Sequence, residues 1–308
     1  MRVEGAPIVA VLGAINVDLV VSGAPLPGPG QTLTGGTFAQ HHGGKGGNQA
    51  VATARAIARG AVFVEASRPR AAAWMLGAVG DDQLGVAALE ALRANDVHTD
   101  HVVVNPEAPT GVALIAVGMD GENQISVAPG ANASLEPSDV VAALETLRPH
   151  VLLVSLEVSE RTARAALEWA RDHDVTTILN PAPPQRWTNG VLGLATYVTP
   201  NEHERPMLEP IPAGIAIIET RGSEGAVIHR TDGSEESVRA PNVPVVDTTG
   251  AGDCFNGVLA AGLAWGIDLS AAVRDAVMAA SLSVGSAGAR EGMPDIHAIS
   301  EARDAFGS

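Results

Sequence analysis

Residues 151–179, VLLVSLEVSERTARAALEWARDHDVTTIL, contain the unit from which we expect the fold to be built. The segments 151–155 and 175–179 are short apolar runs, which are typical of buried strands. Residues 160–172 between them carry apolar side chains at the spacing of a helix. A strand, a helix and a second strand in direct succession are typical of a parallel α/β sheet.

The same alternation extends toward both ends of the chain. Further strands are predicted at 8–12, 74–79, 196–199 and 215–219, and further helices at 83–95, 137–147, 252–265 and 269–285. This order predicts an α/β fold with a doubly wound, mostly parallel sheet, formed by residues 1–308 as a single domain. Segments 18–40 and 101–128 break the rhythm with short alternating stretches and Gly/Pro turns. We expect them to form a small antiparallel sheet that projects as a lid.

The composition excludes several classes of function. The 308 residues include 19 Lys and Arg against 35 Asp and Glu, which gives a formal net charge of −16. Such a surface repels phosphate backbones and anionic lipids, so neither nucleic acid nor a membrane is an expected partner. No apolar run approaches the ~18 residues of a membrane span, and no secretory leader is expected. The single cysteine, Cys254, cannot form an internal disulfide, which fits a cytoplasmic protein.

Residues 247–253, DTTGAGD, stand directly before a predicted apolar helix. Small residues at a helix start expose backbone N–H groups, which stabilise charge that develops on a transferred phosphoryl group. Gly250, Ala251 and Gly252 are therefore a candidate anion hole. An aspartate beside bound phosphate is repelled unless it accepts a proton, so Asp253 is a candidate general base. The alternative is a helix-terminal aspartate that only interacts with the helix dipole.

A second glycine-rich stretch, GGKGGNQA at 43–50, leads into an alanine-rich helix. Its glycines allow an electronegative group to approach the backbone at the helix start. The stretch is not a Walker A loop, because no Ser or Thr follows Lys45 and the glycine spacing differs. The alternative is a turn that only caps the helix.

Asn16 and Asp18 follow the first predicted strand. Ligands of open α/β sheets bind beyond the carboxyl ends of the strands. An amide and a carboxylate at i and i+2 point the same way, which suits two vicinal hydroxyl groups. The alternative is a turn in which both side chains make local hydrogen bonds. Glu157 also follows a strand, and it is either a ligand at the sheet end or an ordinary loop acid.

Together these stretches resemble the ribokinase-like (PfkB) carbohydrate kinases. The matching motifs occur in order: GAINVDLV (13–20), GGKGGNQA (43–50), GAVGDDQLG (77–85), TGVALI (110–115), APGANA (128–133), NPAP (180–183), TPNE (199–202), DTTGAGDCFNG (247–257) and GAREGMP (288–294). DTTGAGD is general to the family, whereas GGKGxNQA with Asn16 and Asp18 is closer to its ribokinase members. The resemblance implies a three-layer α/β/α fold with a β lid. It also implies transfer of a phosphoryl group from ATP to the 5-hydroxyl of D-ribose.

The resemblance further implies roles for matching residues. The family's sugar-binding groups match Asn16, Asp18, Gly44, Lys45, Asn48 and Glu157, with Asp253 as the base. Contacts to phosphate and to Mg²⁺-bound water match Asn201 and Glu204, and nucleotide contacts match Thr220 and Gly222. The family's monovalent cation site, for K⁺, matches Asp247, Thr249, Ser283, Ser286, Gly288 and Gly292. Gly292 stands where the family often has serine, so one ligand is expected to be lost or replaced by water. A homodimer joined through the lid sheets is also implied.

Two other functions stay open at the level of sequence. One is a kinase of the same family for another pentose or for a nucleoside. Phe38 is the single aromatic residue of the predicted lid segments, and this favours a small sugar over a nucleobase. The other is a non-catalytic sugar-binding relative.

Two departures from the family pattern bear on these alternatives. Residues 205–214 contain three prolines, which forbid the helix that follows TPNE in the family. We expect this segment to be extended and to leave the sheet partly uncovered near the nucleotide. Residues 66–73 are predicted to be an insertion.

Overall fold

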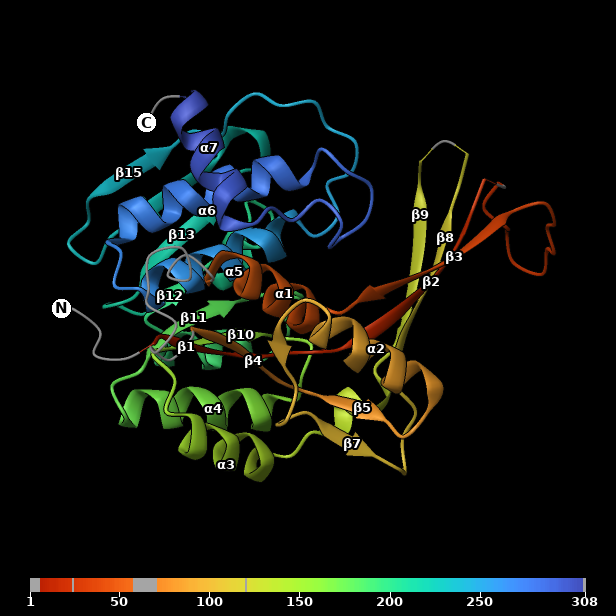
Figure 1. Cartoon of the computed structure of the whole chain (residues 1–308), viewed down its shortest axis with the longest axis horizontal. Coiled ribbons are helices and arrows are strands. Elements are labelled where there is room, and N and C mark those ends of the chain that lie inside the picture. Colours follow the sequence, from red (N-terminus) through yellow and green to blue (C-terminus); the bar gives the residue numbers. More distant parts are fainter. Residues whose placement is uncertain (1–5, 24, 58–70, 120, 307–308) are drawn as a thin grey trace.

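A nine-stranded sheet forms the centre of the molecule. The computed structural model describes residues 6–23, 25–57, 71–119 and 121–306 (Figure 1). The strand order is β15-β14-β13-β12-β11-β10-β1-β4-β6, with β13 to β6 parallel and β14 and β15 antiparallel. Their bounds are β1 Ile8–Leu12, β4 Ala72–Leu76, β6 Val97–His98, β10 Val151–Ser155, β11 Thr176–Asn180, β12 Tyr197–Val198, β13 Ala216–Thr220, β14 Ala226–His229 and β15 Glu235–Val238. The sheet is mostly parallel, as the sequence predicts.

Helices cover both faces of this sheet (Figure 1). One face carries α1 (Lys45–Ile57), α2 (Gln83–Arg93), α5 (Ala251–Ala264), α6 (Leu269–Ser283) and α7 (Ile296–Phe306), and the other carries α3 (Pro137–Leu147) and α4 (Glu160–Asp172). Side chains of β1 alternate between the two cores, with Val9 and Val11 in the first and Ala10 and Leu12 in the second. This is the expected three-layer α/β/α fold.

Helices α3 and α4 begin and end at the predicted residues, because capping groups define their first turns. The hydroxyl of Ser159 accepts the N–H of Thr162 at 3.2 Å at the start of α4. Glu136 and Asp139 form a capping box at the start of α3, and Pro137 occupies its first position.

The contact between α1 and α5 positions the chemistry described below. Gly257 lies on α5 where a Cβ would be 2.5 Å from the Cβ of Ala52 and 2.6 Å from the carbonyl oxygen of Gln49 on α1. No side chain fits at this position, so glycine allows the two helix backbones to approach closely. Asp253, one turn earlier on α5, therefore reaches the first turn of α1.

A four-stranded sheet projects from the body as the expected lid (Figure 1). It contains β3 (Thr37–Gly43), β2 (Asn16–Ser22), β8 (Gly111–Val117) and β9 (Asn123–Ala128) in that order. The outer pairs are antiparallel as predicted, whereas the central pair, β2 with β8, is parallel. The reason is that β2 and β8 both leave the body, with Asn16 opposite Gly111, while β3 and β9 return to it.

Part of the predicted lid belongs elsewhere. Strand β7 (Val103–Asn105) pairs with β5 (Ala78–Gly80) beside the body, so the second lid segment begins at Gly111 rather than at 101. The strand predicted at 74–79 is divided between β4 and β5. Of the predicted insertion, residues 66–70 lie outside the described part of the chain, and Ala72 and Ala73 belong to β4.

The proline-rich segment 205–214 has no α-helix, as predicted, but it is not wholly extended. Residues Arg205–Leu208 form a 3₁₀ turn, η5, and Leu208 is fully buried in the second core. Ile211 packs on the same cluster, where Ile215 and Ile217 are also buried. This short turn therefore covers part of the second core with apolar side chains, which the expectation of a wholly extended segment did not include. The other 3₁₀ turns are η2 Gly130–Ser134, η3 Thr188–Gly190, η4 Leu192–Leu194 and η6 Gly222–Glu224.

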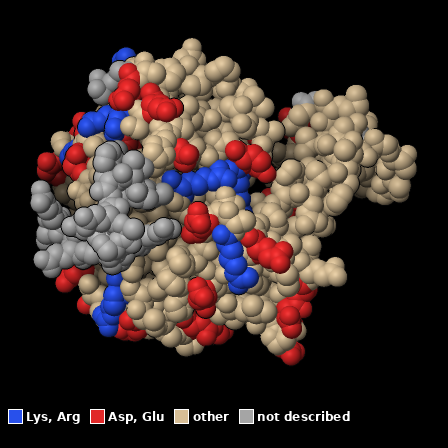
Figure 2. Space-filling view, viewed as in Figure 1, with Lys and Arg blue, Asp and Glu red and all other residues tan. Residues whose placement is uncertain are grey.

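Charged side chains are scattered over the body, whereas the lid is largely free of them (Figure 2). Asp18 is the one acidic residue in the four lid strands, which contain no Lys or Arg. None of the helices in the described part of the chain is long and apolar enough to cross a bilayer.

Candidate active site

Predicted site residues from distant parts of the chain meet at the carboxyl edge of the parallel strands. Asn16 lies shortly after β1, and Glu157 lies shortly after β10. Asn201 follows β12, and Thr220 is the last residue of β13. The strand order reverses at β1, since the chain adds β4 on one side of it and β10 on the other. Open α/β sheets bind ligands at such a switch point.

Asp253 lies in the first turn of α5, and side chains of α1 hold both of its carboxylate oxygens. The Asn48 amide Nδ2 donates to Oδ2 at 3.0 Å, and the Gln49 amide Nε2 donates to Oδ1 at 3.0 Å. Burial raises the pKa of Asp253, while the Lys45 ammonium and these two hydrogen bonds act in the opposite direction. The carboxylate is thus fixed in orientation, and its pKa favours proton acceptance. Gln49 has no role in the sequence-based prediction.

Lys45 provides the positive charge beside this carboxylate. Asp253 raises the pKa of Lys45, and burial acts against that effect. The backbone N–H of Lys45 donates to Glu157 Oε2 at 2.8 Å, which ties the start of α1 to the end of β10. Burial raises the pKa of Glu157, and the hydrogen bond from Lys45 partly offsets this. These three groups form one coupled set of charges.

A cavity of about 110 Å³ opens beside Asp253. Among the predicted residues it is lined by Lys45, Asn201, Glu204, Thr220, Gly250, Gly252 and Asp253, and the further lining residues are Asn180, Ala182, Thr199 and Asn256. The structure therefore brings the predicted base, anion hole and phosphate contacts to one hollow. The third residue of the predicted anion hole, Ala251, lies apart from this lining. The amide of Ala251 donates to the Thr248 carbonyl at 3.3 Å, and Ala251 does not line the cavity.

The base of the lid holds the predicted hydroxyl-binding groups. Asn132 Nδ2 donates to Asn16 Oδ1 at 2.9 Å, and Asn132 also bonds the backbone N–H and carbonyl of Ile15. Asn16 is thus held in place by a residue of the APGANA stretch that carries no predicted role. The carboxylate of Asp18 lies against Gly43, since a Cβ added at position 43 would be 2.2 Å from Asp18 Oδ2. Burial raises the pKa of Asp18, and Arg290 and His41 partly offset this.

Arg290 is a buried cation of the site that the sequence analysis did not identify. Its side chain is 7% exposed. Nε donates to Asn48 Oδ1 at 2.8 Å, and Nη2 donates to the Gly43 carbonyl at 2.9 Å. Burial lowers the pKa of Arg290 to about 10, so the guanidinium stays charged at neutral pH.

Asn201 and Glu204 form a compact turn at the edge of the cavity. Asn201 Oδ1 accepts the backbone N–H groups of His203 and Glu204, and Glu204 Oε2 accepts the N–H of Asn201. Asn201 also bridges to Thr220 on the neighbouring strand. This turn places both Asn201 and Glu204 in the lining of the cavity.

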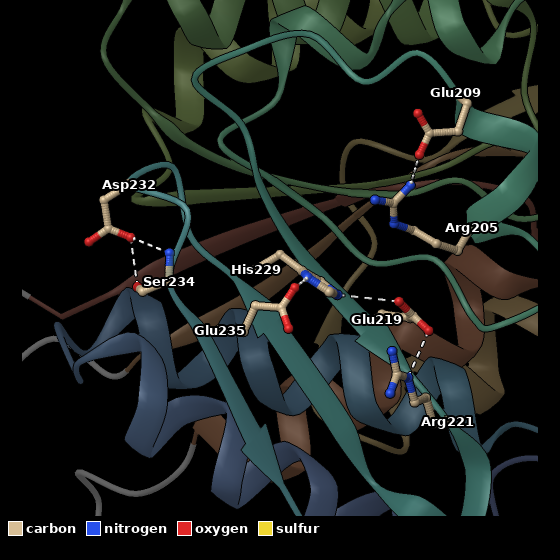
Figure 3. A network of polar contacts seen from close by, with 8 residues as sticks. All are labelled: Arg205, Glu209, Glu219, Arg221, His229, Asp232, Ser234 and Glu235. Atoms are coloured by element: carbon tan, nitrogen blue, oxygen red, sulfur yellow. Dashed lines mark hydrogen bonds and ion pairs between the residues drawn. The ribbon is translucent and has the colours of Figure 1, made fainter.

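A charged network surrounds Glu219, the residue that precedes Thr220 on β13 (Figure 3). Glu219 is mostly buried and accepts from Arg221 Nε at 2.8 Å, which lowers the pKa of Glu219. His229 contacts Glu219 at 3.3 Å and Glu235 at 2.9 Å, so the network joins β13, β14 and β15. Gly222 lies in the turn after β13 and does not line the cavity. Of the two predicted nucleotide contacts, Thr220 therefore lines this cavity, and Gly222 lies in the turn two residues further along the chain.

The predicted cation residues lie before α5 and in the segment from the end of α6 to Gly292, and these two segments contact each other. The two oxygens of Asp247 accept the N–H groups of Thr249 and Gly288, both at 2.9 Å. Burial raises the pKa of Asp247, but the hydrogen bonds from Gly288 and Thr249 outweigh it and lower the pKa. A Cβ at Gly292 would lie 2.0 Å from the Ser283 carbonyl oxygen, so serine does not fit there on this backbone. Asp247 therefore joins the two segments through its two oxygens, and position 292 supplies no side-chain ligand.

Comparisons with known proteins agree with this arrangement. Residues 7–296 match the model of the pfkB family carbohydrate kinases. The chain is 40% identical to a ribokinase of Bacillus subtilis over 306 residues, which cover 95% of this chain and 98% of that protein. It is 36% identical to a ribokinase of Lactococcus lactis, with 94% and 95% of the two chains covered.

A solved structure shows the same fold. The ribokinase of Arabidopsis thaliana, in a complex with ribose and ATP, superposes with a TM-score of 0.82 at 26% identity and covers 97% of this chain and 99% of its own. The family model spans nearly the whole chain, and the DTTGAGD and GGKGGNQA residues meet at one cavity. The chain therefore belongs to the pfkB family of carbohydrate kinases.

Proposed function

We propose that this chain transfers the γ-phosphoryl group of ATP to the 5-hydroxyl of D-ribose. The observation that carries the proposal is Asp253, a buried carboxylate at the start of α5 with both oxygens held by α1. The Lys45 ammonium and Gly250 and Gly252 share its cavity. The identity of 40% to a ribokinase supports ribose as the substrate.

Asp253 acts as the general base. It takes the proton of the 5-hydroxyl, the hydroxyl oxygen attacks the γ-phosphorus, and the bond to the β-phosphate oxygen breaks so that ADP leaves. The start of α5 at Gly250 and Gly252 faces the negative charge that spreads over the transferred group. Lys45 neutralises part of the same charge. Because the groups are already fixed, catalysis rests on positioning and charge stabilisation.

The remaining sugar contacts are assigned at the base of the lid. Asn16, Asp18, Gly44, Asn48 and Glu157 hold the ribose hydroxyls. Asp18 supports this role because no amide or hydroxyl of the described residues donates to its carboxylate, which leaves it free to accept from a sugar.

Asn201, Glu204, Thr220 and Gly222 are assigned to ATP. Mg²⁺ supplies charge neutralisation when it is bound with the nucleotide, and Asn201 and Glu204 contact its water shell or the phosphates. Asp247 and the backbone of Thr249, Ser283, Ser286, Gly288 and Gly292 would hold K⁺, whose charge would stabilise the loop that leads to Gly250.

The lid favours a bare sugar over a nucleoside. His41 stands opposite Asp18 in the β2–β3 pair, and Phe38 is three residues away on the same strand. Successive residues of a strand point to opposite faces, so Phe38 lies on the face remote from Asp18. It cannot stack on a base that is attached to a sugar held by Asp18.

The remote face of the lid also supports a homodimer. Val21, Phe38 and Leu114 lie on it and are about half exposed or more. A second copy of the lid would cover these apolar side chains. A cytoplasmic location is proposed with it, since ATP is the phosphoryl donor.

The test is ADP formation with Mg-ATP and a panel of D-ribose, 2-deoxyribose, other pentoses and nucleosides. Phosphorus and carbon NMR of the product should place the new ester at C5 of ribose. Ribose binding without ADP formation would identify a non-catalytic relative. Faster turnover of a nucleoside would refute the assignment of a bare sugar.

A further inference from the structure

Arg290 joins three parts of the site that are far apart in sequence. It comes from the loop after α6, and its guanidinium reaches Asn48 on α1 and the carbonyl of Gly43, where lid strand β3 ends. Gly47 in the first turn of α1 makes room for it, since a Cβ at this position would lie 2.4 Å from Arg290 Nη2. The buried guanidinium therefore has a built site between α1 and the lid.

The hydrogen bonds around Asn48 allow one orientation of its amide. Arg290 can only donate, so Asn48 must turn Oδ1 toward it. Ionised Asp253 can only accept, so Nδ2 must face Asp253. When Asp253 takes up a proton during the reaction, its hold on Nδ2 weakens, whereas Arg290 still holds Oδ1.

The positive charge of Arg290 also attracts two carboxylates of the site. Asp18 and Asp253 both interact with the guanidinium, and each is a buried carboxylate. An apolar side chain at this position would remove the donors that Arg290 supplies to Asn48 Oδ1 and to the Gly43 carbonyl in a buried place, which is costly. Arg290 thus holds the lid end and the base in one geometry.

We propose that Arg290 is a positioning residue, which orients Asp253 through Asn48 and couples this pair to the base of the lid at Gly43. The inference rests on the proposed role of Asp253 as the base. Arg290 touches neither sugar nor ATP in this account. Its effect should therefore appear in kcat more than in the KM for ATP, and it should depend on Asn48.

The experiment is a double-mutant cycle between Arg290→Met and Asn48→Ala, with kcat and KM measured for ribose and ATP. In the wild-type background Arg290→Met should lower kcat about 10- to 100-fold, the worth of hydrogen bonds to a charged group. With Asn48→Ala already present, it should change kcat less than about threefold, because the two act as a unit. Arg290→Lys keeps the charge and one donor nitrogen, so it should recover part of kcat.

Arg55 provides the matched control. Its Nη1 donates to the carbonyls of Arg290 and Met293, both at 2.7 Å, so it anchors the same loop without contacting Asn48 or Gly43. Arg55→Met should lower the melting temperature and leave kcat within about threefold of wild type. An equal fall of kcat in Arg55→Met would show that Arg290 only anchors its loop, and this would overturn the inference.

Other outcomes are equally decisive. Equal factors for Arg290→Met in both backgrounds would refute action through Asn48, although ribose phosphorylation would stand. A wild-type enzyme that ignores ribose and phosphorylates another sugar would refute the proposed substrate, and the same cycle would then be run on that sugar. If Arg290→Met does not fold, Arg290→Gln and Arg290→Lys carry the cycle, and wild-type kcat in both would refute the proposal.

Discussion

Replacing Asp18 by asparagine should stabilise the free protein while it weakens sugar binding. Burial raises the pKa of Asp18, with Arg290 and His41 offsetting part of this effect. A raised carboxyl pKa in the folded state means that stability is fully present below the unfolded pKa of ~3.9 and is lost as the pH rises through the folded pKa. At neutral pH, ionised Asp18 therefore destabilises the fold, and Asp18→Asn removes that cost.

The loss of sugar affinity follows from the hydrogen bonds that the sugar hydroxyls donate to the charged carboxylate of Asp18. A hydrogen bond to a charged acceptor contributes about 1.5–3 kcal/mol, so the KM for ribose should rise roughly 10- to 150-fold in Asp18→Asn. A sugar without one of the two vicinal hydroxyls donates fewer hydrogen bonds to Asp18. The rise in KM should therefore be smaller for 2-deoxyribose.

Two assays test this pair of effects. Thermal unfolding of the sugar-free protein should give a higher melting temperature for Asp18→Asn at pH 7, and the difference should vanish below pH ~4. Steady-state kinetics should give the rise in KM. Asp100→Asn, an exposed aspartate outside the site, is the control for loss of a negative charge. A lower melting temperature at pH 7, or equal losses for ribose and 2-deoxyribose, would refute the reasoning.

Three further predictions address the scaffold, the base and the cation. Gly257→Ala would place a Cβ 2.5 Å from Ala52, so it should destabilise the fold by about 1–3 kcal/mol in thermal or urea unfolding; an unchanged midpoint would contradict the close α1–α5 contact. Lys45→Met should move the acid limb of the kcat–pH profile upward, because Lys45 lowers the raised pKa of Asp253; a fixed limb would show that the limb belongs to another group. KCl should raise activity more than NaCl at equal ionic strength, whereas equal activity would count against a cation site at Asp247.

The helices and strands with local signals were predicted well. Ser159 and Glu136 mark the starts of α4 and α3 in the sequence, and both helices lie where predicted. The strands at the sheet centre are short apolar runs, and their ends shift by a residue or so because neighbouring strands set their hydrogen bonds.

Two features that depend on long-range contacts were not predicted. Arg290 is 242 residues from Asn48 and 247 from Gly43, so no spacing in the sequence relates them. Its one local signal is its place in the motif GAREGMP, and its role becomes visible only in the fold. The parallel pairing of β2 with β8 likewise follows from how both strands leave the body.

The proline-rich segment shows the limit of a rule based on backbone propensity. Three prolines exclude an α-helix, and none is present in 205–214. The same rule does not reveal that Pro206 can begin a 3₁₀ turn, which buries Leu208 against the sheet.

The most direct test of the central claim is Asp253→Asn, assayed for ADP formation with ribose and for ribose binding by calorimetry. Asparagine keeps the shape of the side chain and removes the proton acceptor. The account predicts that kcat falls by ~10²–10⁴-fold while the dissociation constant for ribose stays within about threefold. Turnover close to that of the wild-type enzyme would exclude Asp253 as the base and contradict the mechanism.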